Sequence, residues 1–415
     1  MKSKLVNWGV ADRQLTNGER WATLIFLLLY ATFSMYNQVK PTTIMVPLGM
    51  QFGMDLSTIG NLMTFYSIAG LVISMPGVWL MRNIGIKTSL AIGGVIQFIG
   101  TMVGIYSTTV GMLMFSRVLE GVGLSVITVL GPNVMPRLFP SKKLGLVMGV
   151  WSMWPAIGII VNSLASPQLY AMGDWQAIWW FSAIINVIAL VLCIIFVKFN
   201  KVSEKDLENK AIEESQGKKN NYVASGVIIS VLFVVYCGLY GNVNTFYPTF
   251  LQEVKGMSLA ASALPTLLYA VLTIPLSIVI GMVTDKFSIR KWWLVGTYAL
   301  IAICGSTFFF TVSSETVTPW LTAIVVAIFA GGAPVATRAL IPLLISDERK
   351  MDYVLGIMSL TTYAGFMFST PYGALAAMSG WPFAAMVFFG GMGIASAIII
   401  AVFVKSDTKL AKGQA

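Results

Sequence analysis

The sequence contains no histidine, and only 11% of its residues are charged. Histidine is the commonest metal ligand and the side chain best suited to proton transfer near neutral pH. Cysteine is also scarce: Cys193, Cys237 and Cys304 stand alone in apolar runs, without the spacing of a disulfide framework or a metal motif. With no nucleophile–base set and no phosphate loop either, we expect no metal site, no cofactor and no enzymatic reaction.

The chain is instead dominated by apolar surface. Of its 415 residues 57% are hydrophobic, and the mean hydropathy is +0.80, whereas a soluble domain carries roughly 25% charged residues. Runs of about 20 apolar residues, enough for a helix to cross a bilayer core about 30 Å thick, recur along the whole chain. Because lipid offers the backbone no hydrogen-bond partner, we expect an all-α membrane protein with twelve transmembrane helices.

The placement of the basic residues predicts an orientation. Lys and Arg outnumber Asp and Glu by 27 to 17, a balance that could indicate nucleic-acid binding. They gather in the tails and in the loops after even-numbered spans, whereas the opposite loops hold Lys255 alone. By the positive-inside rule both termini are cytoplasmic, in a multi-pass protein of the cell (inner, cytoplasmic) membrane. The basic excess is then a topology signal, and we expect no nucleic-acid partner.

A polar stretch near the middle of the chain, Lys198 to Tyr222, divides the spans six and six. It mixes charges of both signs with few large apolar residues, as is typical of a solvated linker. The predicted segments are a cytoplasmic tail at 1–20, a six-helix bundle at 21–198, a cytoplasmic linker at 199–221, a second six-helix bundle at 222–404 and a cytoplasmic tail at 405–415.

Two motifs resemble signatures of the major facilitator superfamily. One joins the second and third spans of the second half, and the other lies in span four; their residues are Gly281, Asp285, Lys286, Arg290 and Lys291, and Arg117, Gly121 and Gly123. The resemblance, to a bacterial transporter of twelve helices, implies two six-helix bundles that flank one central site and rock between inward-open and outward-open states. Asp285 and Arg290 are then candidates for a role in gating.

Four charged residues fall inside predicted spans: Lys40, Arg117, Glu120 and Arg338. An ionisable side chain costs roughly 2.5–3.5 kcal/mol there on insertion scales and usually faces the bundle interior. Three of the four are positive, so Coulomb attraction favours an anion. Arg117 and Glu120 are three residues apart and can pair on one helix face, with Glu120 as a candidate proton carrier. An internal ion pair without a transport role is the alternative.

Lys40 and Arg338 are the predicted anion ligands. Tyr36 lies four residues before Lys40 and shares its helix face, and Asn37 adjoins that face. Arg338 can hold a carboxylate through two parallel hydrogen bonds. The alternatives are a Lys40 that extends to the interface, and an Arg338 that forms a gating salt bridge or simply lies at the interface.

Uncharged groups complete the predicted substrate site. Tyr240 and Asn244 in span seven offer hydrogen bonds, and Trp154 in span five is a candidate cavity wall. Helix packing and lipid contact are the alternatives for these residues.

Together these features predict a secondary active transporter that moves a small organic anion, a carboxylate in particular, by rocker-switch alternating access. Proton symport and anion exchange both fit. The alternatives are efflux of amphipathic compounds, which the 23 methionines and abundant aromatics favour, and a membrane sensor that does not transport. The expected partners are an anionic small molecule, membrane lipid, and protons or a counter-transported anion, with the protein acting as a monomer.

Overall fold

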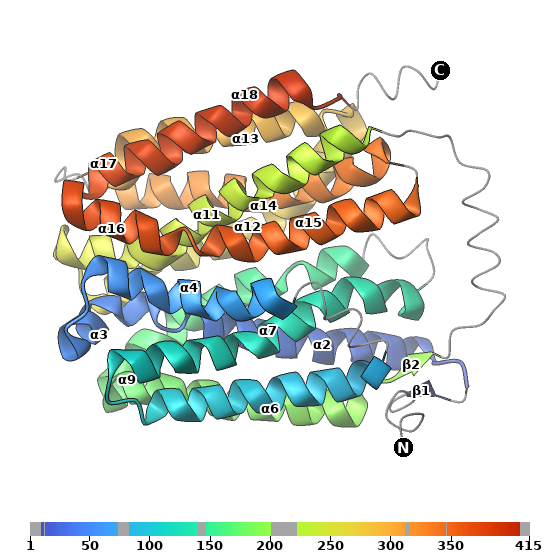
Figure 1. The fold of residues 1–415 in the computed structure, drawn as a ribbon, viewed down its shortest axis with the longest axis horizontal. Coiled ribbons are helices and arrows are strands. Elements are labelled where there is room, and N and C mark those ends of the chain that lie inside the picture. The colour runs from blue at the N-terminus through green and yellow to red at the C-terminus, as the bar shows by residue number, and fades with distance from the viewer. Residues whose placement is uncertain are drawn as a thin grey trace.

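A computed structural model describes residues 10–11, 13–73, 83–139, 147–200, 222–311, 316–345 and 347–406. Within these ranges the chain is almost entirely helical, and ten helices are long and apolar enough to cross a membrane. The helices run side by side along the long axis of the molecule (Figure 1). This architecture confirms the prediction of an all-α membrane fold.

The N-terminal half comprises the helices between residues 17 and 196. A break near Lys40 separates the first helix from a short 3-10 turn and a further helix. The elements are α2 (Asn17–Val39), η1 (Thr42–Ile44), α3 (Met45–Phe52), α4 (Leu56–Ile73), α6 (Ile86–Ile105), α7 (Val110–Leu138) and α9 (Trp154–Phe196).

Helix α9 reverses its direction at Gly173 and Asp174, whose backbone angles are not helical. Before the reversal, Gly158 lies against Met35 and Asn162 donates to Thr42, so this leg runs parallel to α2. After it, Asn186 donates to the carbonyl of Phe33 and Cys193 to that of Phe26, so the second leg returns antiparallel to α2. The 43 residues of α9 therefore make two passes through the bundle.

The C-terminal half comprises the helices between residues 223 and 403. Two of its helices contain π-helical turns, η2 and η3, that pack against each other. The elements are α11 (Val223–Glu253), α12 (Leu259–Phe287), α13 (Arg290–Cys304), η2 (Gly305–Phe309), α14 (Thr318–Leu344), α15 (Glu348–Phe366), α16 (Ser369–Ser379), α17 (Trp381–Ala385), η3 (Met386–Met392) and α18 (Gly393–Phe403).

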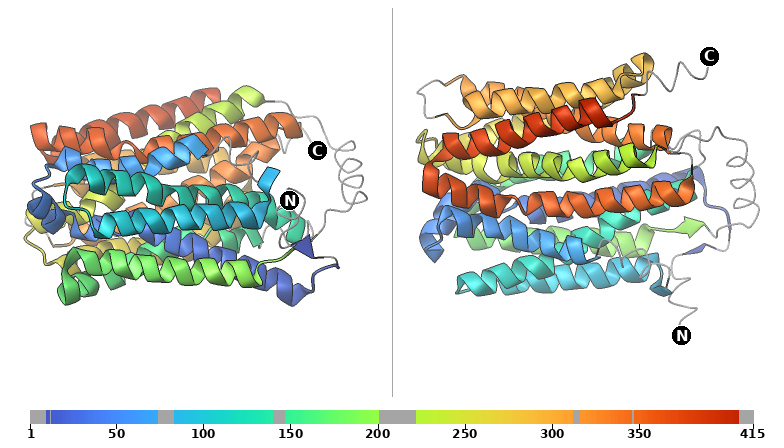
Figure 2. Two further views of the ribbon diagram at one scale, coloured as in Figure 1. Left: turned by 60° about the horizontal axis from the view of Figure 1, so that its bottom comes forward. Right: turned by 45° about the horizontal axis from the view of Figure 1, so that its top comes forward.

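The two halves lie as separate groups of helices, one below the other in Figure 1 and in the right view of Figure 2. The count of twelve spans and the exact segment boundaries stay predictions. Residues 201–221 of the predicted linker lie outside the described residues, as do 1–9 and 12 of the first tail and 407–415 of the last.

Two short strands mark one end of the molecule, called here the terminal end. Strand β1 (Val10–Ala11) pairs in parallel with β2 (Phe199–Asn200), at the same end of the molecule as the last turn of α18 but on its opposite side (Figure 1). Lys198 Nζ lies 3.3 Å from Glu19 Oε1, and its backbone exchanges hydrogen bonds with Thr23. These contacts fasten the start of α2 and the strand before it to the segment after α9.

The opposite end, called here the distal end, holds α3 and α17, and there the two halves are in close contact. Helix α4 crosses α16 so tightly that a β-carbon on Gly60 would overlap the backbone of Ser369. A β-carbon on Gly373 would likewise overlap the carbonyl of Leu56. Such an approach of two backbones requires glycine at both positions.

Hydrogen bonds join the halves beside this crossing. Thr370 Oγ1 donates to Asn61 Oδ1 at 2.6 Å and lies 2.7 Å from Thr64 Oγ1. Gln252 Nε2 donates to the carbonyl of Thr43 at 3.0 Å, which ties α11 to η1. The distal end is therefore held shut by glycine packing and by hydrogen bonds.

Candidate functional site

Three charged side chains from two helices meet inside the N-terminal half. Lys40 Nζ lies 2.7 Å from Glu120 Oε1, and Arg117 pairs with the other carboxylate oxygen of Glu120. All three side chains are fully buried. This group, called here the charge triad, places two cations on one carboxylate.

The break after α2 explains how Arg117 is held. Pro41 has no N–H, so the carbonyl of Asn37, four residues earlier, lacks its usual helical donor. Arg117 supplies one, at 2.8 Å, and also donates to the carbonyls of Gln38 at 2.6 Å and Leu62 at 3.2 Å. The guanidinium thus satisfies carbonyls of α2 and α4 while it pairs with Glu120.

Aromatic rings cover both cations of the triad. Lys40 Nζ lies 4.3 Å from the ring centroid of Trp179, and the Arg117 guanidinium lies 4.5 Å from that of Tyr66. Ring faces attract cations electrostatically, and more so when water is excluded. The sequence pattern pointed to Lys40, Arg117 and Glu120, whereas Trp179 and Tyr66 are distant in sequence and were not predicted.

The structure places the predicted neighbours of Lys40 in contacts within the N-terminal half. Tyr36 Oη lies 3.4 Å from Ser166 Oγ, and Asn37 Nδ2 lies 3.5 Å from Thr101 Oγ1. Lys40 itself is buried against Glu120 and does not extend toward an interface. The predicted pairing of Arg117 with Glu120 is present, and Lys40 joins it.

Arg338, in α14, lies apart from the charge triad in a different environment. The residue is exposed, and the buried Tyr236 and Cys237 of α11 are its neighbours. Among the described residues, no carboxylate pairs with Arg338. The predicted pair Lys40 and Arg338 is therefore split between the two halves.

Tyrosines line α11 near Arg338. The rings of Tyr236 and Tyr240 stack with centroids 5.9 Å apart, and Tyr269 meets Tyr240 edge-on at 6.0 Å. Tyr269 donates to Asn244 Oδ1, and Asn244 Nδ2 donates to the carbonyl of Tyr240 at 3.0 Å. The predicted pair Tyr240 and Asn244 thus belongs to one network with Tyr269, which sequence analysis did not single out.

The remaining predicted residues take separate positions. Trp154, half-buried at the start of α9, packs against buried apolar side chains of the interior. Asp285 and Arg290 form an ion pair of 2.5 Å at the end of α12, with the Asp285 side chain 62% exposed. That pair lies in the loop region that carries the superfamily-like motif, as the sequence suggested.

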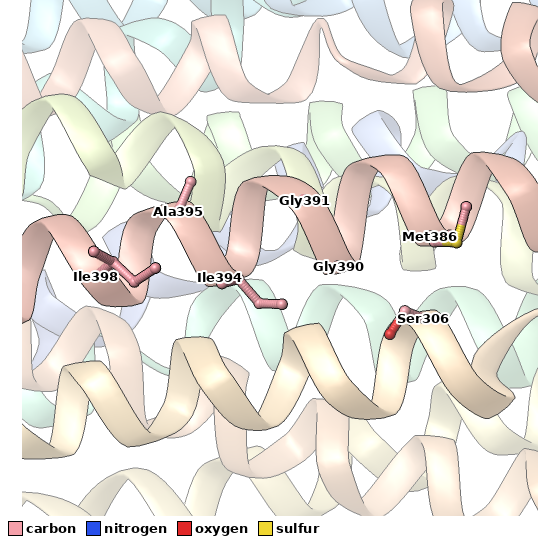
Figure 3. A pocket seen from close by; sticks show the side chains of 7 residues that line it. All are labelled: Ser306, Met386, Gly390, Gly391, Ile394, Ala395 and Ile398. Atoms are coloured by element: carbon pink, nitrogen blue, oxygen red, sulfur yellow. The ribbon is translucent and has the colours of Figure 1, made fainter.

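A pocket of about 550 Å³ lies away from all of these residues, between the α13–η2 and η3–α18 helices (Figure 3). Its lining is apolar except for one serine, and Met386, Ile394 and Ile398 expose about half of their side-chain surface. None of the predicted site residues lines it. The lining residues are Ser306, Met386, Gly390, Gly391, Ile394, Ala395 and Ile398.

Two relatives are transporters by name. The chain is 22% identical over 248 residues to the probable anion transporter 6, chloroplastic, of Arabidopsis thaliana, which covers 55% of this chain and 47% of the plant protein. It is 23% identical over 286 residues to the probable nitrate transporter NarT of Staphylococcus aureus, which covers 69% and 71%. The chain thus spans about half the length of the plant relative.

Solved structures and a family profile agree on the fold. The inward-open xylose transporter XylE from E. coli superimposes with a TM-score of 0.73 over 95% of this chain and 99% of that one, at 16% sequence identity. The sequence profile of the Major Facilitator Superfamily matches residues 22–349 and 267–415. Together with the ten helices in the described part of the chain that are long and apolar enough to cross a membrane, this match identifies a multi-pass membrane protein. The chain belongs to the Major Facilitator Superfamily.

Proposed function

We propose that the protein is a secondary active transporter that carries a small organic anion, a carboxylate in particular, by alternating access of its two halves. The observation that carries this proposal is Arg338, an exposed guanidinium in α14 without a carboxylate partner among the described residues. A guanidinium matches the two oxygens of a carboxylate, so Arg338 is the anchor for the substrate. Tyr236, whose ring stacks on that of Tyr240, is a neighbour of Arg338.

The charge triad supports coupling to protons. With all three groups ionised, Lys40, Arg117 and Glu120 sum to one positive charge. Protonation of Glu120 would leave two buried cations without a counterion, which is strongly unfavourable. A bound anion compensates this excess positive charge, so the binding of a proton and the binding of an anion favour each other. This reasoning favours symport over anion exchange, and Glu120 is the proposed proton carrier.

The relatives support an anion over other substrates. The plant relative is named an anion transporter and the staphylococcal one a nitrate transporter. XylE, which carries xylose, shares the fold, so the fold alone does not select the substrate. The surplus of buried and exposed cations in this chain is the feature that selects a negative charge.

The rest of the assignment follows the same proposal. The protein lies in the cell membrane with both termini in the cytoplasm, so the terminal end faces inward. It works as a monomer in lipid, with Tyr36, Asn37, Asn244 and Trp154 as supporting polar and aromatic groups around the substrate path. The Asp285–Arg290 pair acts in gating at the cytoplasmic face.

Uptake into proteoliposomes tests the anion site. Purified protein is challenged with nitrate, monocarboxylates and dicarboxylates under an imposed proton gradient. For the anion that is transported, we expect Arg338→Ala to raise KM at least tenfold. Arg338→Lys should raise KM less, because lysine keeps the positive charge but lacks the two parallel N–H donors of the guanidinium. Lys350→Ala, at an exposed ion pair, is the control. An unchanged KM in Arg338→Ala would reject this anchor.

Efflux of amphipathic compounds is the second candidate, and the methionine and aromatic content favours it. Expression in a drug-sensitive host separates the two. Growth on an organic acid without added drug resistance supports anion uptake, whereas resistance to several unrelated compounds supports efflux.

A further inference from the structure

One aromatic side chain of the C-terminal half reaches into the N-terminal half. Tyr363 of α15 is 5% exposed and shares a hydrogen bond with Thr128 of α7. Its ring lies directly against Gly70 of α4, where an added β-carbon would overlap ring atoms. Tyr363 thus joins the two halves through one hydrogen bond and one close ring contact.

This contact lies between the charge triad and the terminal end. Thr128 follows Glu120 by eight residues in α7, which is about 12 Å along the helix axis. Gly70 follows Leu62, the residue that accepts from Arg117, by the same distance in α4. Helix α7 runs toward the terminal end, because the Phe139 ring that follows it packs on Trp21 and α7 contacts β2.

The distal side of the triad is closed by a different contact. There α4 crosses α16 at Gly60, which precedes Leu62. The buried triad therefore lies between two contacts that join the halves, the α4–α16 crossing on one side and Tyr363 on the other.

We propose that Tyr363 is a gating residue that closes the path between the charge triad and the terminal end. The phenol hydroxyl holds Thr128, and the ring fills the space that Gly70 leaves open. Opening requires this hydrogen bond to break and the ring to leave Gly70, so that protons reach the triad from that side. The assignment rests on the proposed transport function, but the closure itself can be measured without a substrate.

A reporter cysteine in place of Ser67 tests the closure. Ser67 is fully buried and lies one turn before Gly70 on the same face of α4, between the two contacts. Full-length Ser67→Cys protein in inside-out vesicles is treated with a membrane-impermeant maleimide, and the chain that keeps Ser67 gives the background of the three native cysteines. We expect slow labelling with Tyr363 present and at least tenfold faster labelling after Tyr363→Ala.

Milder variants keep the test decisive if Tyr363→Ala does not fold. Tyr363→Phe and Thr128→Val each remove the hydrogen bond and keep the ring, so each should speed labelling several-fold, and the double variant should add little. Tyr353→Phe, on the same helix but 64% exposed, should leave the rate unchanged. Fast labelling of the chain that retains Tyr363, or equal rates in all Tyr363 and Thr128 variants, would overturn the gate.

The two proposals fail in different ways. Labelling of the Ser67→Cys reporter depends on access alone, so the gate stands or falls whichever compound is carried. If Tyr363→Phe speeds labelling but no anion is transported by the parental protein, the gate is retained and the anion assignment is lost. If anion uptake depends on Arg338 but the labelling rate does not depend on Tyr363, the anion assignment is retained and the gate is lost.

Discussion

Each charged side chain in the protein interior depends on a small set of named partners. Lys40 and Arg117 share the carboxylate of Glu120, and Arg117 also occupies carbonyls freed by the break at Pro41. Removal of Lys40 leaves a neutral Arg–Glu pair, whereas removal of the carboxylate leaves two buried cations. The three residues are therefore not equivalent for stability.

Thermal unfolding of purified protein should show this difference. We expect Glu120→Gln to lower the free energy of unfolding by about 3 kcal/mol or more, because it removes the counterion of a buried group. Lys40→Met should lower the free energy of unfolding clearly less, since Arg117 and Glu120 remain paired. A Lys40→Met protein less stable than Glu120→Gln would contradict the charge balance assigned to the triad.

Asp55 is a titrating group outside the membrane-crossing helices. Its Oδ1 accepts from the backbone N–H of Thr58 at 2.8 Å at the start of α4, and hydrogen bonds from Thr58 hold the pKa of Asp55 below its ordinary value. A lowered pKa means that the ionised form stabilises the folded state. This contribution is complete above the ordinary aspartate pKa and is lost as the pH falls through the lowered one.

The Asp55→Asn variant distinguishes the effect of the carboxylate charge from the effect of the helix cap. Asparagine caps helices about as well as aspartate but does not titrate. We expect the parental protein to be the more stable at neutral pH, and its advantage over Asp55→Asn to shrink as the pH falls below the ordinary aspartate pKa of about 4. Melting curves of both proteins above and below that pKa provide the measurement. A constant difference would show that the carboxylate charge contributes nothing at this cap.

At the residue scale the sequence predicts the charges better than their partners. The cost of an ionisable group in a span singles out Lys40, Arg117, Glu120 and Arg338 from the sequence alone. Spacing within one helix predicts the Arg117–Glu120 pair as well. The approach of Lys40 to Glu120, eighty residues away, depends on how α2 packs on α7, which no local pattern records.

Helix crossings at the distal end depend on glycine. Gly60 and Gly373 each face the backbone of the opposing helix, so a larger residue fits only when α4 and α16 separate. In a protein that alternates between two arrangements, a clash present in one arrangement shifts the population toward the other. These two glycines are therefore suited to bias the conformational equilibrium.

Gly60→Val and Gly373→Val should each open the distal end. A reporter pair, Asn61→Cys with Thr370→Cys, places two thiols where side chains now share a hydrogen bond. We expect either valine to slow oxidative crosslinking of the pair at least tenfold, because the clash disfavours the closed arrangement. Gly296→Val, where a β-carbon meets no neighbour, is the matched control. Crosslinking at the parental rate in both valine variants would exclude this role.

At the element scale, local chemistry predicts breaks more readily than it predicts their consequences. Pro41 predicts the end of α2, and the Gly173–Asp174 pair predicts the reversal inside α9. The π-helical turns η2 and η3 carry no such signal. They form where Gly305 packs on Phe389 and Gly390 on Ser306, so they depend on contacts between helices far apart in sequence.

The whole molecule has two distinct ends, and labelling can assign each end to a side of the membrane. Gln14 lies at the terminal end, whereas Met50 and Met378 are highly exposed at the distal end. By the positive-inside rule, a cysteine in place of Gln14 should react with an impermeant maleimide only in inside-out vesicles. Cysteines in place of Met50 and Met378 should react in intact cells. The same sidedness for all three positions would reject the orientation.

For the whole molecule, hydropathy and charge are sufficient to predict an all-helical membrane protein, because the bilayer leaves the backbone few alternatives. The pairing of the two halves at Gly60, Gly373 and Tyr363 was not predictable in the same way. Those contacts depend on shape complementarity between surfaces that are more than two hundred residues apart, and only the folded chain brings them together.

The pairing of β1 with β2 has a consequence for biosynthesis. Val10 and Ala11 leave the ribosome early, but their partners Phe199 and Asn200 are made nearly two hundred residues later. The segment Val10–Ala11 therefore stays without its partner strand until the second pass of α9 and β2 have been translated. The strand pair and the Glu19–Lys198 contact then close together, so this corner of the molecule is finished only once the entire first half has been inserted.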